Sequence, residues 1–392
     1  MSSQIPYSGA PSRLATLLDV NLTNVANNQV IKYDESQNRW INATGGGGTD
    51  LSTLNPVAIG FESGDTGQQT NSVAIGFQAG YDTQNSASVA IGSEAGRNTQ
   101  KTNAVAIGTN AGSNLQSARG IAIGNNAGAL GQEVDTIAIG TSAGSNGQKT
   151  QSIAIGENAG QITQQTNSVA IGLEAGRYIQ GERSLAIGFQ AGSNRQGAGS
   201  MAIGQSAGSN EQGASSFAIG KDAGSNKQGF NTMAIGIRAG AVEQGSESVA
   251  IGGSAGTEFQ KPFCVAIGNV AGRNLQAQGA VAIGFASGLQ EQKTSAVAIG
   301  LSAGRSNQGC NSVAIGNQAG SNNQGEYSIA IGHNCVSTAN NSIVINASAT
   351  ALNKTATGFF VNSSSIRAVP AGLGVGVLYY DTVNQEILRS TT

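Results

Sequence analysis

Short apolar runs return along this chain at a fixed distance. The tripeptide Ala-Ile-Gly begins at Ala58 and recurs every 16 residues as far as Ala330, which gives eighteen copies without insertion or deletion. In each copy, as from Ser72 to Gly76, the run is β-prone and turn-prone residues follow it. No segment keeps the 3.6-residue apolar period of an amphipathic helix. The pattern predicts one short strand and one set of turns per unit.

The constant spacing predicts a stack of coils. A unit of 16 residues is too short for a helical hairpin, which takes about 34 residues in a tetratricopeptide repeat. One coil per unit lets each strand pair in parallel with the next, and a slip of one residue would turn every side chain to the wrong face. We therefore expect an all-β protein, a parallel β-roll or β-solenoid of eighteen coils. At about 4.8 Å per coil, the rod would be about 85 Å long.

Alternation along the strand sends Val73 and Ile75 to one face of it. The slot of Val73 takes Leu, Met or Phe in other units, as a core position that tolerates different sizes would. We therefore expect Val73, Ile75 and the equivalent Ile203 to fill the core of each coil.

Ala74 and Gly76 point to the other face of the strand. The Ala slot never varies in the eighteen copies, whereas an Ala that faced solvent would be free to change to Ser, Thr or Lys. Constant smallness indicates that another backbone packs closely there, and one thin coil cannot cover both faces of its own strand. We therefore expect Ala74, Gly76 and Ala202 to lie at a contact with a second copy of the chain.

A Gln occupies one slot in seventeen of the eighteen units, from Gln68 to Gln324. A buried amide needs hydrogen-bond partners, and Gln side chains stacked at the spacing of one coil can bond to one another in a ladder. We expect Gln164, Gln196 and Gln228 to belong to such a ladder. The alternative is an exposed turn residue, because Gln favours exposure. An exposed slot would vary among polar residues, as the next slot along the chain does.

Composition narrows the function more than the fold. The net charge of −2 offers no basic footprint for nucleic acid, and no stretch reaches the roughly 18 apolar residues of a membrane span. Cys264, Cys310 and Cys335 occupy three different slots, so we expect free thiols, as in a reducing compartment. His333 is the only His and cannot make a His-based triad credible. We expect no enzymatic activity, no metal and no cofactor.

The unit Asn-Ser-Val-Ala-Ile-Gly-x-x-Ala, found at Asn71–Ala79, Asn167–Ala175 and Asn311–Ala319, resembles the head repeat of trimeric autotransporter adhesins. The resemblance covers about residues 56 to 345. It implies a left-handed β-roll, a homotrimer and a role in attachment to a host glycan or protein receptor. The adhesin repeat is usually shorter and lacks the Gln slot.

The ends of the chain resemble other fibres. Residues 17–48 are similar to a module of tailed-phage and giant-DNA-virus fibre proteins, and Gly-Phe-Phe-Val-Asn at 358–362 is similar to the ends of giant-virus surface proteins. These likenesses imply a fibre on a virion surface or an extracellular fibre, anchored to a base structure through its N-terminal module. Residues 1–10 lack the basic and apolar regions of a signal peptide, so we expect synthesis in the cytosol without one.

Four segments follow from these patterns. Residues 1–44 form a hairpin module that acts as cap or anchor, 45–55 a Gly-rich joint, 56–345 the repeat shaft, and 346–392 a C-terminal hairpin cap or tip. Both open ends of a solenoid need closure. A projecting tip meets a target first, so we expect tip contacts from its aromatic residues, which are Phe359, Phe360, Tyr379 and Tyr380.

The most concrete function is a structural fibre or spike that mediates attachment. The alternative is a self-assembling extracellular filament that binds no receptor. An ice-binding solenoid would need a slot that is mostly Thr, and a carbohydrate-processing fibre enzyme would need clustered carboxylates. The sequence shows neither, and it gives no sign of membrane insertion.

Overall fold

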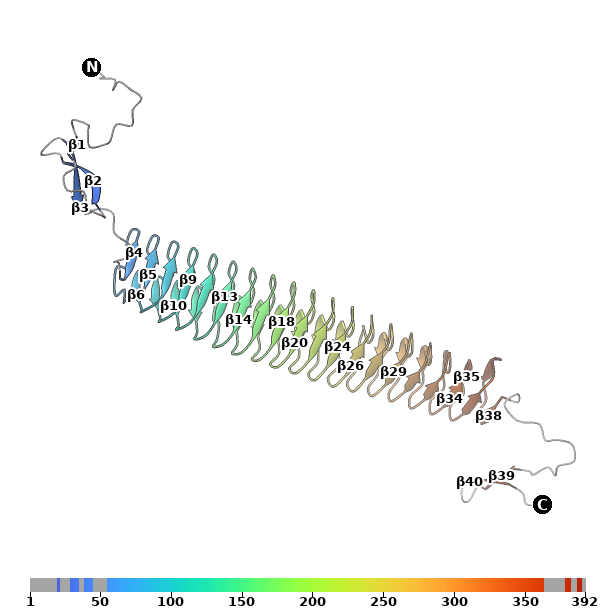
Figure 1. Ribbon diagram of the computed structural model, residues 1–392. Helices are drawn as coiled ribbons and strands as arrows, with labels where there is room; N and C mark the ends of the chain where they lie inside the picture. Colours follow the sequence, from blue (N-terminus) through green and yellow to red (C-terminus); the bar gives the residue numbers. More distant parts are fainter. Residues whose placement is uncertain are drawn as a thin grey trace, which may run out of the picture.

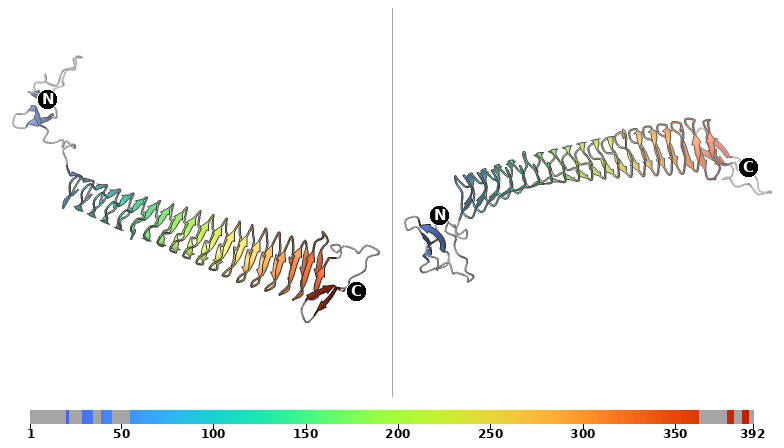
Figure 2. Two further views of the ribbon diagram at one scale, coloured as in Figure 1. Left: turned by 60° about the horizontal axis from the view of Figure 1, so that its bottom comes forward. Right: turned by 90° about the horizontal axis from the view of Figure 1, so that it is seen from above.

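The computed structural model describes residues 20–21, 29–34, 39–44, 55–362, 378–381 and 386–389, with side chains for 55–362. Residues 55–362 form a long, narrow rod of stacked coils (Figure 1). Two further views show that the coils follow one another along a gently bent axis (Figure 2). All regular elements in the described part of the chain are strands, and they stack in parallel with 16-residue spacing. The predicted β-solenoid is confirmed.

The first sheet of the rod contains the Val-Ala-Ile run of every coil. Its twenty strands pair each with the next in parallel, and Ala154 on β14 is opposite Ala170 on β16. The strands are β4 (Val57–Ile59), β5 (Val73–Ile75), β7 (Val89–Ile91), β9 (Val105–Ile107), β11 (Ile121–Ile123), β13 (Ile137–Ile139), β14 (Ile153–Ile155), β16 (Val169–Ile171), β18 (Leu185–Ile187), β20 (Met201–Ile203), β22 (Phe217–Ile219), β24 (Met233–Ile235), β26 (Val249–Ile251), β27 (Val265–Ile267), β29 (Val281–Ile283), β31 (Val297–Ile299), β33 (Val313–Ile315), β34 (Ile329–Gly332), β36 (Ile343–Asn346) and β38 (Phe359–Val361).

The second sheet contains the short strand that ends at the Gln slot. It is divided into runs of four, six and three strands, and isolated bridges at Asn146 and Glu258 connect the runs. The strands are β6 (Asp82–Gln84), β8 (Asn98–Gln100), β10 (Asn114–Gln116), β12 (Leu130–Gln132), β15 (Ile162–Gln164), β17 (Tyr178–Gln180), β19 (Asn194–Gln196), β21 (Asn210–Gln212), β23 (Asn226–Gln228), β25 (Val242–Gln244), β28 (Asn274–Gln276), β30 (Gln290–Gln292) and β32 (Ser306–Gln308).

Glycine makes the corner after each first strand possible. Gly76 has φ +131°, and a Cβ atom there would lie 2.6 Å from the carbonyl oxygen of Gly92 in the next coil. Gly80 has φ +54°, and its Cβ would lie 2.6 Å from Oε1 of Gln84. Only glycine satisfies both the left-handed backbone and the lack of space. The invariance of these two slots therefore reflects contacts inside one chain.

The interior of each coil is narrow and lined by small residues. Ala74, Ala79, Gln84 and Ser88 are completely buried and lie between the two sheets. The strand pattern of half-buried, buried, half-buried recurs in nearly every coil of the first sheet, and its buried member is the Ala. The core of the rod is therefore made of alanine, glutamine and serine.

The prediction that Val73, Ile75 and Ile203 fill the core is wrong for this chain. These side chains are half-buried and lie on the outside of the first sheet. The physical reason is space. A Gln amide crosses the interior of each coil beside Gly80, and the gap that remains accommodates a methyl group but no branched side chain.

The C-terminal end of the stack departs from the regular repeat. Ile329 pairs with Ile343, so this coil has 14 residues, and Ile343 pairs with Phe359 at the usual 16. The stack therefore continues to Val361, and the shaft boundary predicted at residue 345 lies too early. Val344 replaces the Ala, and the partly buried Leu352 and Phe360 pack against the last interior residues. Strands β35 (Cys335–Ser337) and β37 (Leu352–Lys354) close this end from the other side.

The two predicted terminal hairpins are present as backbone pairs. Strand β2 (Gln29–Asp34) pairs antiparallel with β3 (Arg39–Thr44), and β1 (Val20–Asn21) joins the same sheet. Strand β39 (Leu378–Asp381) pairs antiparallel with β40 (Glu386–Arg389). Their role as caps stays a prediction, and the rest of residues 17–48 and 363–392 lies outside the described residues.

Candidate functional site

The outer surface of the first sheet is a continuous apolar strip. We call it the apolar face, and it consists of the first and third side chains of every first-sheet strand from β4 to β34. Most are half-buried, and several are more open, with Ile315 38% and Phe217 37% exposed. Phe61 and Phe77 lie beside the strip at its N-terminal end, where their rings stack with centroids 5.9 Å apart. At about 4.8 Å per strand, the strip is about 80 Å long.

The residues predicted to contact a second chain lie elsewhere. Ala74 and Ala202 have no exposed surface at all, and both point into their own coil. Gly76 abuts the backbone of Gly92 in the next coil. The inference that a backbone packs closely against these slots was sound, but that backbone belongs to the same chain. The assignment of Ala74 and Ala202 to a chain-chain contact is therefore wrong, and that of the half-buried Gly76 stays a prediction.

The Gln side chains form a buried ladder inside the rod. Gln164 Nε2 donates to Oε1 of Gln180 at 3.0 Å and to the carbonyl oxygen of Ile153 at 2.7 Å. Gln196 and Gln228 donate in the same way to the next Gln at 3.2 and 3.1 Å. All of these side chains are at most 3% exposed. The exposed-turn alternative does not fit these positions.

The ladder is interrupted at four points. No hydrogen bond joins the Gln pairs 68 and 84, 180 and 196, 212 and 228, or 244 and 260 among the described side chains. The Oε1 atoms of Gln84, Gln196, Gln228 and Gln260 are accordingly buried without a partner there. Every amide in the ladder still donates to a backbone carbonyl of its own coil. The amide-to-backbone bond is therefore the constant element, and the bond between coils is additional.

The outer surface of the second sheet carries the variable residues. We call it the variable face, and it is defined by the two slots that flank the Gln, occupied by Thr83 and Asn85 in one coil. Opposite charges in successive coils pair along it, as between Lys227 and Glu243 at 3.9 Å. Because Ala74 and Gln84 point toward each other from the two sheets, the variable face and the apolar face look in opposite directions.

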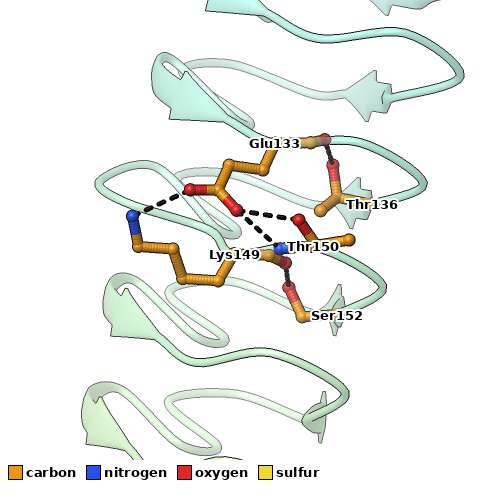
Figure 3. A network of polar contacts seen from close by, with 5 residues as sticks. All are labelled: Glu133, Thr136, Lys149, Thr150 and Ser152. Carbon is orange, nitrogen blue, oxygen red and sulfur yellow. Dashed lines mark hydrogen bonds and ion pairs between the residues drawn. The ribbon is translucent and has the colours of Figure 1, made fainter.

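Glu133 shows how the variable face connects coils (Figure 3). Its carboxylate accepts hydrogen bonds from Lys149 Nζ at 2.8 Å, from Thr150 Oγ1 at 2.8 Å and from the Thr150 amide at 3.0 Å. These donors favour the charged form, so the pKa of Glu133 is lowered, mainly by the hydrogen bond from Lys149 and against the effect of burial. The pair is half-exposed, so its contribution to stability is small.

Two of the three thiols are buried within the rod. Cys264, Cys310 and Cys335 are free. Burial raises the pKa of Cys264 and of Cys335 to about 11. Within residues 55–362, no three His, Cys, Asp or Glu side chains gather as metal ligands do. In the same part of the chain, no helix is long and apolar enough to cross a membrane.

Two of the four predicted tip residues have described side chains. Phe359 is 59% exposed, whereas Phe360 packs against the end of the core and lies under Lys354 Nζ at 5.2 Å. Phe360 therefore helps to close the solenoid. Tyr379 and Tyr380 lie on β39, opposite β40, and their side chains fall outside the described residues.

Part of the coil stack matches a known family of repeats. The model of the YadA head domain repeat matches residues 148–175, 180–207, 309–334 and 324–345. The chain carries YadA head domain repeats. The YadA head matches lie within the coil stack, and the last one includes the 14-residue coil. None of the curated proteins compared with the chain gives a match.

The apolar face is the candidate functional feature that the sequence analysis missed. One signal for it was present: two Ala slots and one Gln slot per coil are almost constant. A Gln amide fits inside a coil only beside residues as small as alanine. Once Gln is placed inside, the alternation of the strand turns Val and Ile outward.

Proposed function

We propose that this chain is the shaft of a non-enzymatic, homotrimeric surface fibre in which three rods pack through their apolar faces. The YadA head repeats support the trimer, because YadA heads belong to trimeric adhesins. The observation that carries the proposal is the apolar face itself, a strip of Val and Ile some 80 Å long at one strand per 4.8 Å. A soluble monomer rarely leaves a contiguous apolar surface of this extent in water.

The apolar face also has the shape that a rod-to-rod contact requires. Its residues repeat in register from coil to coil, as Ile155 pairs with Ile171 and Ile187 with Ile203. Three identical strips can therefore meet along one axis without a change of contacts from coil to coil. The chain-chain contact that the sequence placed at Ala74 and Ala202 moves to the opposite side of the same strand.

We further propose that the fibre projects from a cell or virion surface and mediates attachment. The YadA head repeats favour a surface adhesin. The likeness of residues 17–48 and 358–362 to viral fibre ends supports a virion as the base structure. A receptor contact at the C-terminal module, with Phe359 and the tyrosines of β39, stays part of this proposal.

Sedimentation of charge variants tests the trimer. The chain is expected at three times 39.2 kDa, about 118 kDa. The double variant Ile203→Asp, Ile219→Asp should sediment as a folded monomer, because these side chains point out of the coil. The matched control Ala198→Asp, Ala214→Asp puts the same charges at exposed positions off the apolar face and should stay trimeric. A wild-type monomer, or dissociation of the control alone, would refute the proposal.

A further inference from the structure

A hollow on the variable face combines an apolar wall with a lysine side chain that makes no ion pair among the described residues. It has a volume of about 310 Å³ and spans three coils, with Phe259 and Leu275 as its wall and Lys261 and Lys293 at its two ends. Ala277 lies between the two lysines in the same slot and is too small to fill the space. The volume lies at the lower end of the range for small-molecule sites.

Local sequence explains why the hollow forms here. The slot before the Gln holds Phe259 and Leu275 in successive coils, and they are 39% and 51% exposed. The slot after the Gln holds Lys261, Ala277 and Lys293. Since coils lie about 4.8 Å apart, the backbones of the two lysines are about 10 Å apart. A small residue between two long ones leaves a depression whose ends are both positively charged.

The charges of the hollow do not cancel. Lys293 Nζ lies 3.5 Å from the carboxylate of Glu291, which forms part of the wall. Lys261 makes no ion pair among the described residues, and its side chain is exposed. One positive charge is therefore left without a partner beside an apolar wall.

We propose that this hollow binds an acidic sugar, a pyranose ring that bears a carboxylate. The ring's apolar face would cover Phe259 and Leu275, and its carboxylate would pair with Lys261. The proposal gives the attachment function its ligand class and rests on that function. The site stays open in the proposed trimer, because it lies on the variable face, opposite the apolar face.

The backbone around the hollow argues against an added peptide strand. The amide of Leu275 donates to the carbonyl of Glu258 at 3.0 Å, and the amide of Ala277 to that of Gln292 at 2.8 Å. The amide of Lys261 donates to the carbonyl of Gln276 at 2.9 Å. Strand addition needs free backbone groups, and these groups are used between coils. A short hollow closed by a lysine at each end suits one or two sugar rings.

Saturation-transfer NMR on the full chain tests the site with three probes. Sodium glucuronate combines the ring with the carboxylate, glucose has the ring alone, and N-acetylglutamate amide has the carboxylate alone. We expect transfer to glucuronate that falls as salt rises, and little transfer to the other two. Equal signals from glucose and glucuronate, or stronger binding of the glutamate probe, would overturn the proposal.

A filled hollow provides the decisive variant. Ala277→Gln places in this slot a residue that the same slot holds at Gln165, so the coil should fold as before. It should abolish the glucuronate signal, whereas Ser117→Gln, which introduces Gln in the same slot of a distant coil, should leave the signal unchanged. Lys261→Gln should reduce glucuronate transfer to the level of glucose. Unchanged binding in Ala277→Gln would refute the site.

Sedimentation of the same samples separates this proposal from the trimer. A trimer that fails to bind glucuronate would overturn the ligand assignment and leave the fibre intact. A monomer that binds glucuronate would overturn the trimer and leave the site intact.

Discussion

Replacing one ladder glutamine with leucine should destabilise the rod from inside. Gln164→Leu keeps a similar volume but removes the donor to the carbonyls of Ile153 at 2.7 Å and Ser168 at 3.4 Å and to Gln180 Oε1 at 3.0 Å. Gln148 keeps its bonds to two backbone carbonyls, so its amide is not left alone. Three buried acceptors therefore lose a donor, at about 1–3 kcal/mol for each of the two shorter bonds and less for the third. Apolar burial of the leucine offsets part of this, which leaves about 2–5 kcal/mol.

The neighbouring position supplies the control. Gln165→Leu makes the same chemical change one residue away, at a partly exposed side chain, and should cost less than about 0.5 kcal/mol. Urea unfolding followed by circular dichroism measures both variants. Because coils interact mainly with their neighbours, hydrogen exchange of peptides around residues 148–180 should show faster opening in Gln164→Leu alone. Equal midpoints for the two variants would show that the amide ladder contributes nothing to stability.

Three further changes test the coil. Ala202→Leu should lower the melting temperature strongly, since the interior of the coil has no room for the larger side chain. Ala198→Leu, at an exposed position, should leave it nearly unchanged. Equal melting temperatures would contradict the alanine core. Gly204→Ala should destabilise, because its φ is +123° and the new Cβ would lie 2.9 Å from the next coil's backbone; Gly199→Ala, at φ +65° with more room, is the control in melting experiments. The lowered pKa of Glu133 means that its carboxylate stabilises the folded rod above the unfolded-state pKa, and that this stabilisation is lost as pH falls through the folded-state pKa. Glu133→Gln should therefore remove this change in the free energy of unfolding at acid pH, which amounts to less than about 1 kcal/mol. A variant with the wild-type pH profile in unfolding titrations would show that the contact with Lys149 has no effect.

The periodicity of the sequence predicted the architecture, but hydrophobicity predicted the wrong face of each first-sheet strand as the buried one. The 16-residue spacing is enough to place one coil per unit, and alternation places Ile203 and Ala202 on opposite faces. Which face is inward depends on the width of the coil. That width is set by corners such as Gly204, by left-handed residues such as Ser206 and by the amide of Gln212, which together leave a narrow interior.

Other features depend on contacts that no single slot reveals. The hollow at Ala277 arises because a small residue lies between Lys261 and Lys293, 16 residues away on each side, and beside Phe259 and Leu275. Each of these residues alone is an ordinary member of a variable slot. The stack that continues to Val361 through a shortened coil was likewise hidden, because the Ala-Ile-Gly signature ends with the coil before.

The central claim is that chains meet through the apolar face, and interchain distances between spin labels test it most directly. In a chain whose three native cysteines are replaced by alanine, one label is placed at Ile203→Cys on the apolar face and, separately, at Glu211→Cys on the variable face. The proposed trimer predicts a short interchain distance at residue 203 and a clearly longer one at residue 211. The reverse order, or no interchain coupling at residue 203, would contradict the account.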